Sequence, residues 1–552
     1  MRFLFIIFIF LLVYSCKDST SRDAREPVSK SETVEYSQDS SDLDAISTKD
    51  VKFKVLDSKH ISKSDIWAEI NLQMEDFTKA DYERLKPLIL EQDIPKLQKH
   101  ISEGKFDYVA LTKFYLYRIR KFDRENNLSL NSVISINPNV IKEAKALDQA
   151  SDENHLIYGM PILLKDNINA SGMPTTAGAV ALKDNITEDA FLVKQLKSKG
   201  ALILGKANLS EWAYFFCGSC PSGYSAIGGQ TLNPYGREII DTGGSSSGSG
   251  VSASANFAAA TIGSETAGSI LSPASQNSVV GLKPTVGLVS RSGVVPISST
   301  LDTAGPITRF VIDNAIVLDA IFGEDVSDSK SFMILWDSGF YTEKIQEANL
   351  QGKRFGAPKS LMNDSLFNKA VEVLKLQGAQ IVEIEEQDIN LPNFINLLNI
   401  DMKKDLPNYM ESYANSSIKL RTVADVMAFN SKDSVSTMPY GQSLFRGIVN
   451  DNGDEVFLEK IKDTLKTNGK QFFDVPMKQN NLDGYLSINN YHAAYAAVAE
   501  YPAITVPMGY TKTGVPKGLT FISKSLKEKQ LLEWAYIYEQ ASKARKAPKD
   551  YN

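Results

Sequence analysis

A segment rich in glycine and serine is the feature of the sequence that could most directly carry chemistry. Residues 241–250 read DTGGSSSGSG, a composition also typical of flexible linkers and of phosphate-binding loops. The phosphate-loop pattern G-x-x-x-x-G-K-[ST] is absent, because no lysine follows the glycines. A linker is disfavoured because the small, apolar residues 251–260 follow directly and predict a tightly packed helix. Glycines here would instead let the backbone come close to a reacting group.

A second turn of small residues follows soon after the first. Residues 263–270 read GSETAGSI, and they come directly after the apolar residues 258–262, which predict a buried helix end or strand. Small residues in a turn can direct several backbone N–H groups at one point, which is the geometry that stabilises an oxyanion.

These segments together resemble the signature of the amidase signature family. Residues 243–285 contain G-G-S-S-x-G-S, then G-[ST]-[DE]-x-x-G-S, then G-L-K-P-T. Ser245 and Ser269 stand at the separation found in that family, and Lys165, in GMPILLKDN, matches its lysine. The similarity covers nearly all of residues 105–545. It is greatest to bacterial peptide amidases, on the strength of residues 228–231, 265–266 and 287–293.

The resemblance implies a Ser-Ser-Lys catalytic triad. Ser269 would be the nucleophile, Lys165 the base, and Ser245 the relay between them, following a cis Gly244–Ser245 peptide. A free lysine has a pKa of about 10.4, but burial disfavours the ammonium form and would make Lys165 a usable base. The apolar residues 161–164 lead up to Lys165 and agree with burial.

The resemblance also implies an oxyanion hole built from backbone N–H groups. These would belong to Thr266, Ala267, Gly268 and Ser269. Ala267 departs from the family pattern, which usually has Asp or Gly there, so substrate choice would differ if that side chain shapes the site. No metal or organic cofactor is implied. The four histidines are not spaced as metal ligands.

Strand-like and helix-like segments alternate along the chain and predict an α/β fold. Residues 62–150 are predicted to be mainly helical, and the resemblance implies a large mixed central sheet with helices on both faces. Strands are predicted over 161–164, 201–204, 380–384, 503–506 and 519–522, and helices over 138–148, 188–199, 367–376 and 526–544. The net charge of -6 and the absence of a long basic stretch argue against nucleic acid, so we predict no nucleic-acid partner.

The N-terminus predicts export and lipidation. Residues 3–13 are an unbroken apolar run, and Cys16 follows a small residue, as in a bacterial lipobox. We therefore predict a signal peptide over 1–16, a disordered tether over 17–60 and one amidase domain over 61–552. The protein would be anchored to a membrane of the cell envelope, the outer membrane in preference to the inner. An ordinary signal peptide or an uncleaved anchor is the alternative.

The predicted activity is hydrolysis of a carboxamide C–N bond, with small amides or short peptides carrying a C-terminal amide as substrates. A lipid-anchored binding protein that keeps the amidase fold is one alternative. An amidotransferase-type subunit is the other, and an export signal argues against it. Cys217 and Cys220 could form a small disulfide loop or remain two thiols, whereas a zinc site would need two more ligands.

Overall fold

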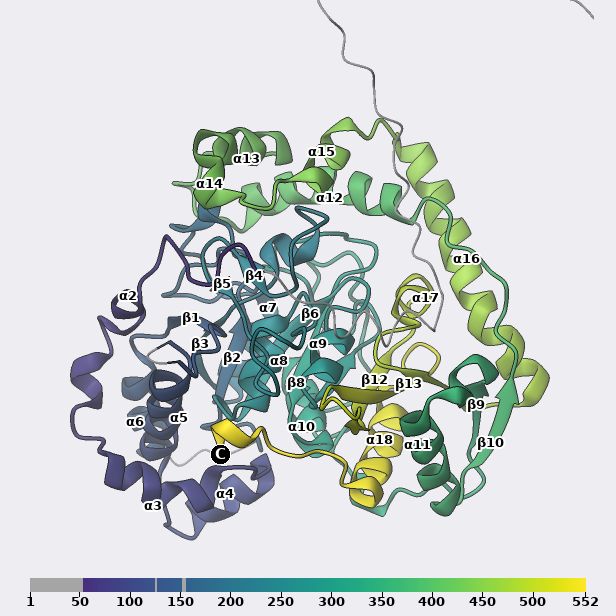
Figure 1. The fold of residues 1–552 in the computed structure, drawn as a ribbon, viewed down its shortest axis with the longest axis horizontal. Coiled ribbons are helices and arrows are strands. Elements are labelled where there is room, and N and C mark those ends of the chain that lie inside the picture. The colour runs from purple at the N-terminus through teal and green to yellow at the C-terminus, as the bar shows by residue number, and fades with distance from the viewer. Residues whose placement is uncertain (1–52, 125–126, 151–154) are drawn as a thin grey trace, which may run out of the picture. The chain divides into compact units, whose positions relative to one another are not determined.

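The computed structural model describes residues 53–124, 127–150 and 155–552 (Figure 1). All of them belong to one compact unit. The predicted signal segment and most of the predicted tether lie outside the described residues, so the domain boundaries stay predictions. One part of the tether prediction is corrected. Residues 53–60 are held in the fold because the Leu56 carbonyl accepts hydrogen bonds from the Gln230 amide (2.8 Å) and from Asn131 Nδ2 (3.2 Å).

Eleven strands form one mixed sheet in the order β1-β3-β2-β6-β8-β7-β12-β13-β11-β9-β10, and β4 pairs with β5 separately. The strands are β1 (Val133–Ile136), β2 (Pro161–Lys165), β3 (Leu202–Ala207), β4 (Tyr224–Ser225), β5 (Gly229–Gln230), β6 (Ala260–Glu265), β7 (Val280–Lys283), β8 (Thr303–Thr308), β9 (Arg354–Pro358), β10 (Gln380–Ile384), β11 (Gly484–Ile488), β12 (Ala503–Tyr510) and β13 (Pro516–Ile522). Strands β3, β2 and β6 run parallel, as do β11, β9 and β10. The remaining pairs are antiparallel.

Helices surround this sheet. The α-helices are α2 (Lys63–Trp67), α3 (Lys79–Ile89), α4 (Ile94–Ser102), α5 (Tyr108–Phe122), α6 (Val140–Asp148), α7 (Phe191–Ser198), α8 (Ser247–Ser254), α9 (Leu271–Gln276), α10 (Val311–Ile321), α11 (Ser365–Leu376), α12 (Phe394–Ser412), α13 (Val423–Asn430), α14 (Ser434–Thr437), α15 (Ser443–Asn450), α16 (Glu455–Asn480), α17 (Ala493–Val498) and α18 (Glu528–Ser542). Short 3-10 helices are η1 (Asn71–Met74), η2 (Val180–Leu182), η3 (Glu211–Tyr214), η4 (Ile345–Glu347), η5 (Lys359–Asn363), η6 (Ser431–Asp433) and η7 (Lys549–Tyr551).

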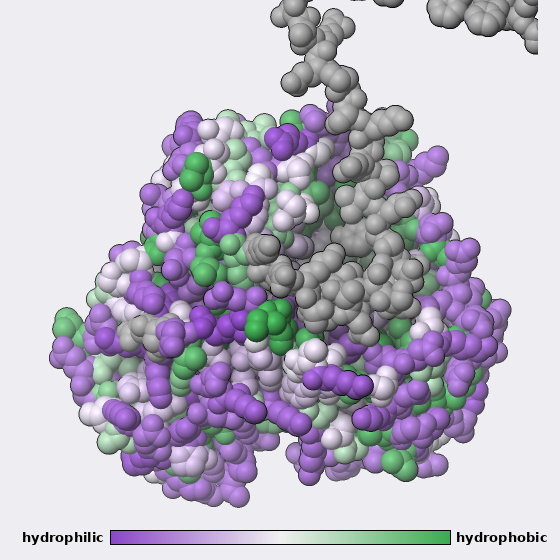
Figure 2. Space-filling model, in the orientation of Figure 1, coloured by the Kyte–Doolittle hydropathy of each residue, from purple (hydrophilic) through white to green (hydrophobic). Residues whose placement is uncertain are grey.

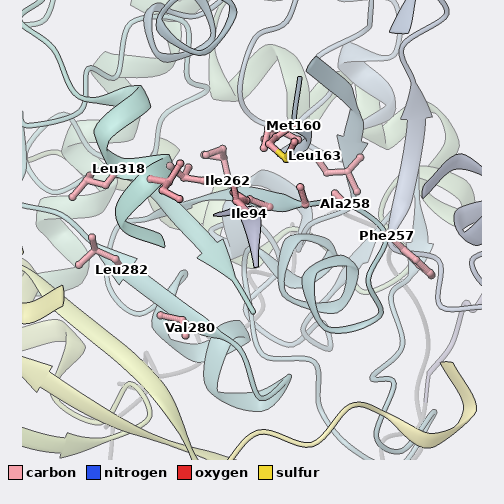
Figure 3. Close-up of a cluster of buried hydrophobic side chains, with 14 of the residues drawn as sticks. Ile94, Met160, Leu163, Phe257, Ala258, Ile262, Val280, Leu282 and Leu318 are labelled. Carbon is pink, nitrogen blue, oxygen red and sulfur yellow. The ribbon is translucent and has the colours of Figure 1, made fainter. Parts of the chain in front are cut away.

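Strand β6 shows how both faces of the sheet are covered. Thr261 faces α8, since its hydroxyl donates to the Ser249 carbonyl at 3.1 Å. Its neighbour Ile262 points to the opposite face, because side chains alternate along a strand. There it joins a buried apolar cluster that includes Leu282 of β7 and Leu318 of α10 (Figure 3). The fold is therefore α/β with a large mixed sheet, as predicted.

Most predicted elements are present, and two regions differ. The strands predicted over 161–164, 201–204 and 380–384 correspond to β2, β3 and β10. The helix predicted over 251–260 is displaced: α8 begins within the glycine-serine segment at Ser247, and β6 begins at Ala260. Strand β1 lies in a region predicted to be helical, where it pairs with β3.

The face seen in Figure 2 is mainly hydrophilic, and the hydrophobic residues visible on it are scattered. Across residues 53–124, 127–150 and 155–552, the chain contains no helix that is long and apolar enough to cross a membrane.

The close contact of α8 with its neighbours predicts a large penalty for one methyl group. A Cβ on Gly248 would lie 2.4 Å from the Asn208 carbonyl oxygen and 2.6 Å from that of Ser132. Gly248→Ala should lower the free energy of unfolding by about 3 kcal/mol, because backbone atoms on both sides must move. Urea denaturation would measure this. Gly447→Ala is the control, since a Cβ there meets nothing nearer than 3.8 Å, and it should stabilise α15 by about 0.5–1 kcal/mol. Equal stability of the two variants would contradict the prediction.

Candidate active site

Parallel pairing of β2 with β6 brings the predicted lysine to the second turn. Leu164 of β2 lies opposite Ile262 of β6, so both strands end at the same edge of the sheet. Lys165 is the last residue of β2, and the turn 266–269 begins where β6 ends at Glu265. Two segments about a hundred residues apart in sequence therefore meet through sheet register.

Lys165 contacts one of the predicted serines directly. Its Nζ lies 2.7 Å from Ser245 Oγ, 2.9 Å from Ser264 Oγ and 3.1 Å from the Ser264 carbonyl oxygen. The peptide bond between Gly244 and Ser245 is cis, as the resemblance implied. Among the described residues, the amine forms hydrogen bonds with neutral groups only, and no carboxylate of these residues is bound directly to it.

Burial sets the protonation of Lys165. The side chain is completely buried, and loss of hydration lowers the pKa of its amine to about 7. The negative charges of Asp302 and Glu265 oppose this effect, and each raises the pKa in part. The amine can therefore be neutral near neutral pH, which is the form that accepts a proton.

The first turn of α8 is fastened to β6 by serine side chains. Ser246 Oγ donates to the Ser264 carbonyl (3.0 Å) and accepts from the Ser264 amide (3.2 Å), while Ser249 Oγ donates to the Ile262 carbonyl (3.0 Å). A Cβ on Gly263 would lie 2.8 Å from Ser246 Oγ, so only glycine fits beneath this contact. The glycine-serine segment is thus a packed part of the site, and the linker interpretation is excluded.

Ser269 lies beside this segment at the end of the turn. The Ser246 amide donates to the Ser269 carbonyl at 3.2 Å, and the Ser269 residue is half-buried. Among the described residues no hydrogen bond joins the hydroxyls of Ser245 and Ser269. The structure therefore brings Lys165 together with Ser245, and brings the backbone of Ser269 alongside.

The turn between β6 and α9 leaves several amides available. The Glu265 carboxylate accepts from the amides of Ile270 (2.7 Å) and Leu271 (3.0 Å), the two residues after the turn. In the described part of the chain, the amides of residues 266–269 donate to no acceptor. Gly268 has a φ of +97°, which favours glycine. Free amides on a fixed turn can bind a developing negative charge.

Three residues of this site escaped sequence reasoning. Ser264 binds Lys165, and Asn167 Nδ2 donates to Ser264 Oγ at 2.9 Å. Asp302 accepts from the Thr266 hydroxyl at 2.5 Å and from the amides of Ile297 and Ser298, which steadies the start of the turn. Asn167 and Asp302 fall inside segments that resemble the family, and this is the signal that could have found them.

The structure settles the state of the cysteine pair. Cys217 and Cys220 are joined by a disulfide bond in a buried loop. Within the described residues, no group of three or more His, Cys, Asp and Glu side chains is arranged to hold a metal ion.

Comparison with known proteins identifies the class. The family model described as Amidase matches residues 110–450. A probable amidase of Arabidopsis thaliana is 36% identical over an alignment of 488 residues, which covers 84% of this chain and 92% of that protein. The chain belongs to the amidase signature family, as its motifs predicted, and it is an amide hydrolase.

Similar proteins include two with solved structures and an amidotransferase subunit. The crystal structure of an amidase family protein from Bacillus anthracis aligns with a TM-score of 0.84 and 36% identity, over 90% of this chain and 100% of that one. Peptide amidase from Stenotrophomonas maltophilia aligns with a TM-score of 0.77 and 38% identity, over 83% and 99%. A glutamyl-tRNA(Gln) amidotransferase subunit from Thermoanaerobacter pseudethanolicus is 30% identical, over 82% and 97%.

The prediction of a lipid-anchored envelope protein is wrong. The relatives include amidases of Arabidopsis thaliana and Schizosaccharomyces pombe, whose cells have no bacterial envelope, and the family does not depend on such a location. The prediction relied on a short apolar run and one small residue before Cys16, a pattern too brief to be specific. These residues lie outside the described part of the chain.

The contacts of Ser264 predict a role in catalysis. Ser264→Ala removes two hydrogen bonds, to Lys165 and to Asn167, but keeps the carbonyl contact. Amide hydrolysis, measured as ammonia release, should fall about tenfold, while the melting temperature changes little. Ser254→Ala is the matched control, because the hydroxyl of this buried serine of α8 has no hydrogen-bond partner among the described residues, and it should keep full activity. Unchanged turnover in Ser264→Ala would refute the role.

Proposed function

We propose that this protein hydrolyses primary carboxamides through a serine acyl-enzyme, with short peptides carrying a C-terminal amide as its substrates. The observation that carries the proposal is the buried contact between Lys165 Nζ and Ser245 Oγ, at 2.7 Å. A neutral amine held against a hydroxyl is a base in position to take its proton.

The catalytic steps follow from this arrangement. Neutral Lys165 takes the proton of Ser245, which takes the proton of Ser269 as Ser269 Oγ attacks the amide carbonyl. The C–N bond breaks, the proton returns through the same chain to the nitrogen, and ammonia leaves. Water then attacks the acyl-enzyme ester in the same way and releases the acid. The hydrogen bond from the Ser246 amide to the Ser269 carbonyl supports the closeness of the two serines that this relay requires.

The oxyanion of each tetrahedral intermediate would be bound by the turn. The candidate donors are the backbone amides of Thr266, Ala267, Gly268 and Ser269. Their freedom from other acceptors supports this role, because a preorganised donor costs no rearrangement when charge develops. Backbone donors also make the role independent of the side chain at Ala267.

Similarity to peptide amidase supports the choice of substrate. The chain is 38% identical to that enzyme over nearly its whole length, against 30% for the amidotransferase subunit. An amidotransferase-type subunit remains the second candidate function on the strength of that 30% identity. A non-catalytic binding protein is disfavoured, because Lys165 and Ser245 would have no reason to keep a buried contact that desolvates an amine.

A panel of amides tests the proposal. The purified chain alone should release ammonia from an amidated dipeptide faster than from an anilide or a long-chain fatty amide. Ser269→Ala should reduce turnover by about 10⁴-fold or more, because the nucleophile is lost, while circular dichroism and melting temperature stay as in the wild type. Ser269→Ala with near wild-type turnover would refute the triad. A preference for fatty amides with the dipeptide untouched would refute the substrate.

The protonation of Lys165 predicts how the rate depends on pH. Burial lowers its pKa to about 7, and only the unprotonated amine can accept a proton from Ser245. The kcat/KM of hydrolysis should therefore rise about tenfold per pH unit below about 7 and level off above it. Lys165→Ala should lose several orders of magnitude and lose this dependence. A rate that falls as pH rises from 6 to 8 would contradict lysine as the base.

A further inference from the structure

The loop between β11 and α17 lies against the turn that ends in Ser269. A Cβ placed on Gly268 would lie 3.1 Å from Asn490 Nδ2 and 3.5 Å from the Ala493 Cβ. Asn490 therefore covers the backbone of the residue immediately before Ser269. It reaches the site from a strand and helix more than two hundred residues further along the chain.

The side-chain amide of Asn490 is exposed, and it has no hydrogen-bond partner among the described residues. Its backbone is held, because the Tyr491 amide donates to the Ile488 carbonyl and the Ala493 amide donates to the Asn490 carbonyl, each at 3.0 Å. An unused donor and acceptor on a fixed backbone is the kind of group that orients a ligand.

Asn489 anchors this loop to the sheet from one side. Its amide donates to the Gly518 carbonyl (2.9 Å), its Oδ1 accepts from the Gly518 amide (2.8 Å), and its carbonyl accepts from the Thr520 hydroxyl. These contacts fix Asn489 to β13, and the next residue, Asn490, lies over Gly268 of the turn.

A chain of three polar side chains anchors the loop from the other side. His492 Nδ1 lies 2.6 Å from Ser487 Oγ, and His492 Nε2 lies 2.6 Å from Glu386 Oε1. Ser487 is completely buried and aromatic rings enclose the imidazole, Phe472 at 5.5 Å and Tyr485 at 5.2 Å between ring centres. This serine cannot meet a substrate, so the chain is a support for the loop and not a second catalytic centre.

We infer that Asn490 is a specificity-determining residue that hydrogen-bonds a peptide group of the substrate's acyl part, with His492 and Glu386 as positioning residues. The inference rests on the proposed function, because Asn490 adjoins the turn where the scissile carbonyl would bind. A carboxamide side chain can both donate and accept, so it matches the C=O and N–H of a peptide bond. A small amide without a peptide bond would not use it.

Two substrates and a matched pair of variants test the role of Asn490. Asn490→Leu keeps the size of the side chain but removes its hydrogen bonds. The kcat/KM for an amidated dipeptide should fall about tenfold, mainly through KM, while the kcat/KM for propionamide stays within about twofold. Asn363→Leu is the control, since Asn363 is also exposed, at the end of η5, and it should change neither value.

Glu386→Ala tests whether the contact between Glu386 and His492 positions the loop that carries Asn490. Removal of its bond to His492 should raise KM for the amidated dipeptide about threefold and leave kcat for propionamide unchanged. Equal losses on both substrates, in either variant, would overturn the inference about Asn490. Unchanged kinetics of Asn490→Leu would overturn it as well. Neither result would affect the proposed function. A wild-type protein that hydrolyses neither amide would overturn both.

Discussion

Burial of the Lys165 amine is the constraint on which the rest of the site depends. A charged ammonium is expensive to hold away from water, so the amine loses its proton near pH 7 instead of near 10. Carboxylates at contact distance would cancel this effect, and the structure keeps Glu265 and Asp302 turned to other partners. Glu265 accepts from the amides that follow the turn, and Asp302 accepts from the residues around it. The same acids thus shape the turn, and their charges raise the pKa of Lys165 only in part.

A dry amine needs close packing on every side, and the glycine-serine segment provides it. Helix α8 packs so closely on its neighbours that Gly248, against Asn208 and Ser132, and Gly263 of β6, against Ser246, have no room for a Cβ. Water cannot enter between α8 and β6 at this distance, so the hydroxyls of Ser246 and Ser249 hydrogen-bond the backbone carbonyls of β6 directly. The linker-like composition therefore has two uses. The glycines allow the helix and strand to pack closely, and the serines supply hydrogen bonds to the strand. Chemistry and packing select the same small residues.

This double requirement explains where sequence reasoning succeeded and where it failed. Strand β2 could be predicted because its apolar run is local, and its resemblance to the family identified Lys165. Helix α8 was misplaced because glycine and serine have low helix propensity, and only tertiary packing makes Ser247–Ser254 helical. Ser264 was missed because its contact with Lys165 depends on the pairing of two strands, which no local pattern encodes. Strand β1 is short and is stabilised by pairing with β3, which the local sequence does not show.

The groups proposed for recognition and those proposed for reaction come from different parts of the chain, and this separation follows from the fold. The proposed reacting groups belong to residues 165–269 and are fixed by β2, β6 and α8, where Gly248 and Gly263 leave no room for a methyl group. The groups over Gly268 belong to a later loop, fixed by β11 and β13, where an exposed side chain can change without disturbing the sheet. Ala267 lies on the same rim and is partly exposed. With an alanine and an amide there in place of a carboxylate, this part of the rim carries no charge. Under the proposed mechanism, uncharged side chains here would impose no charge requirement on a neutral carboxamide. Exchange of these side chains would then alter which amide is bound and leave the buried amine of Lys165 unchanged.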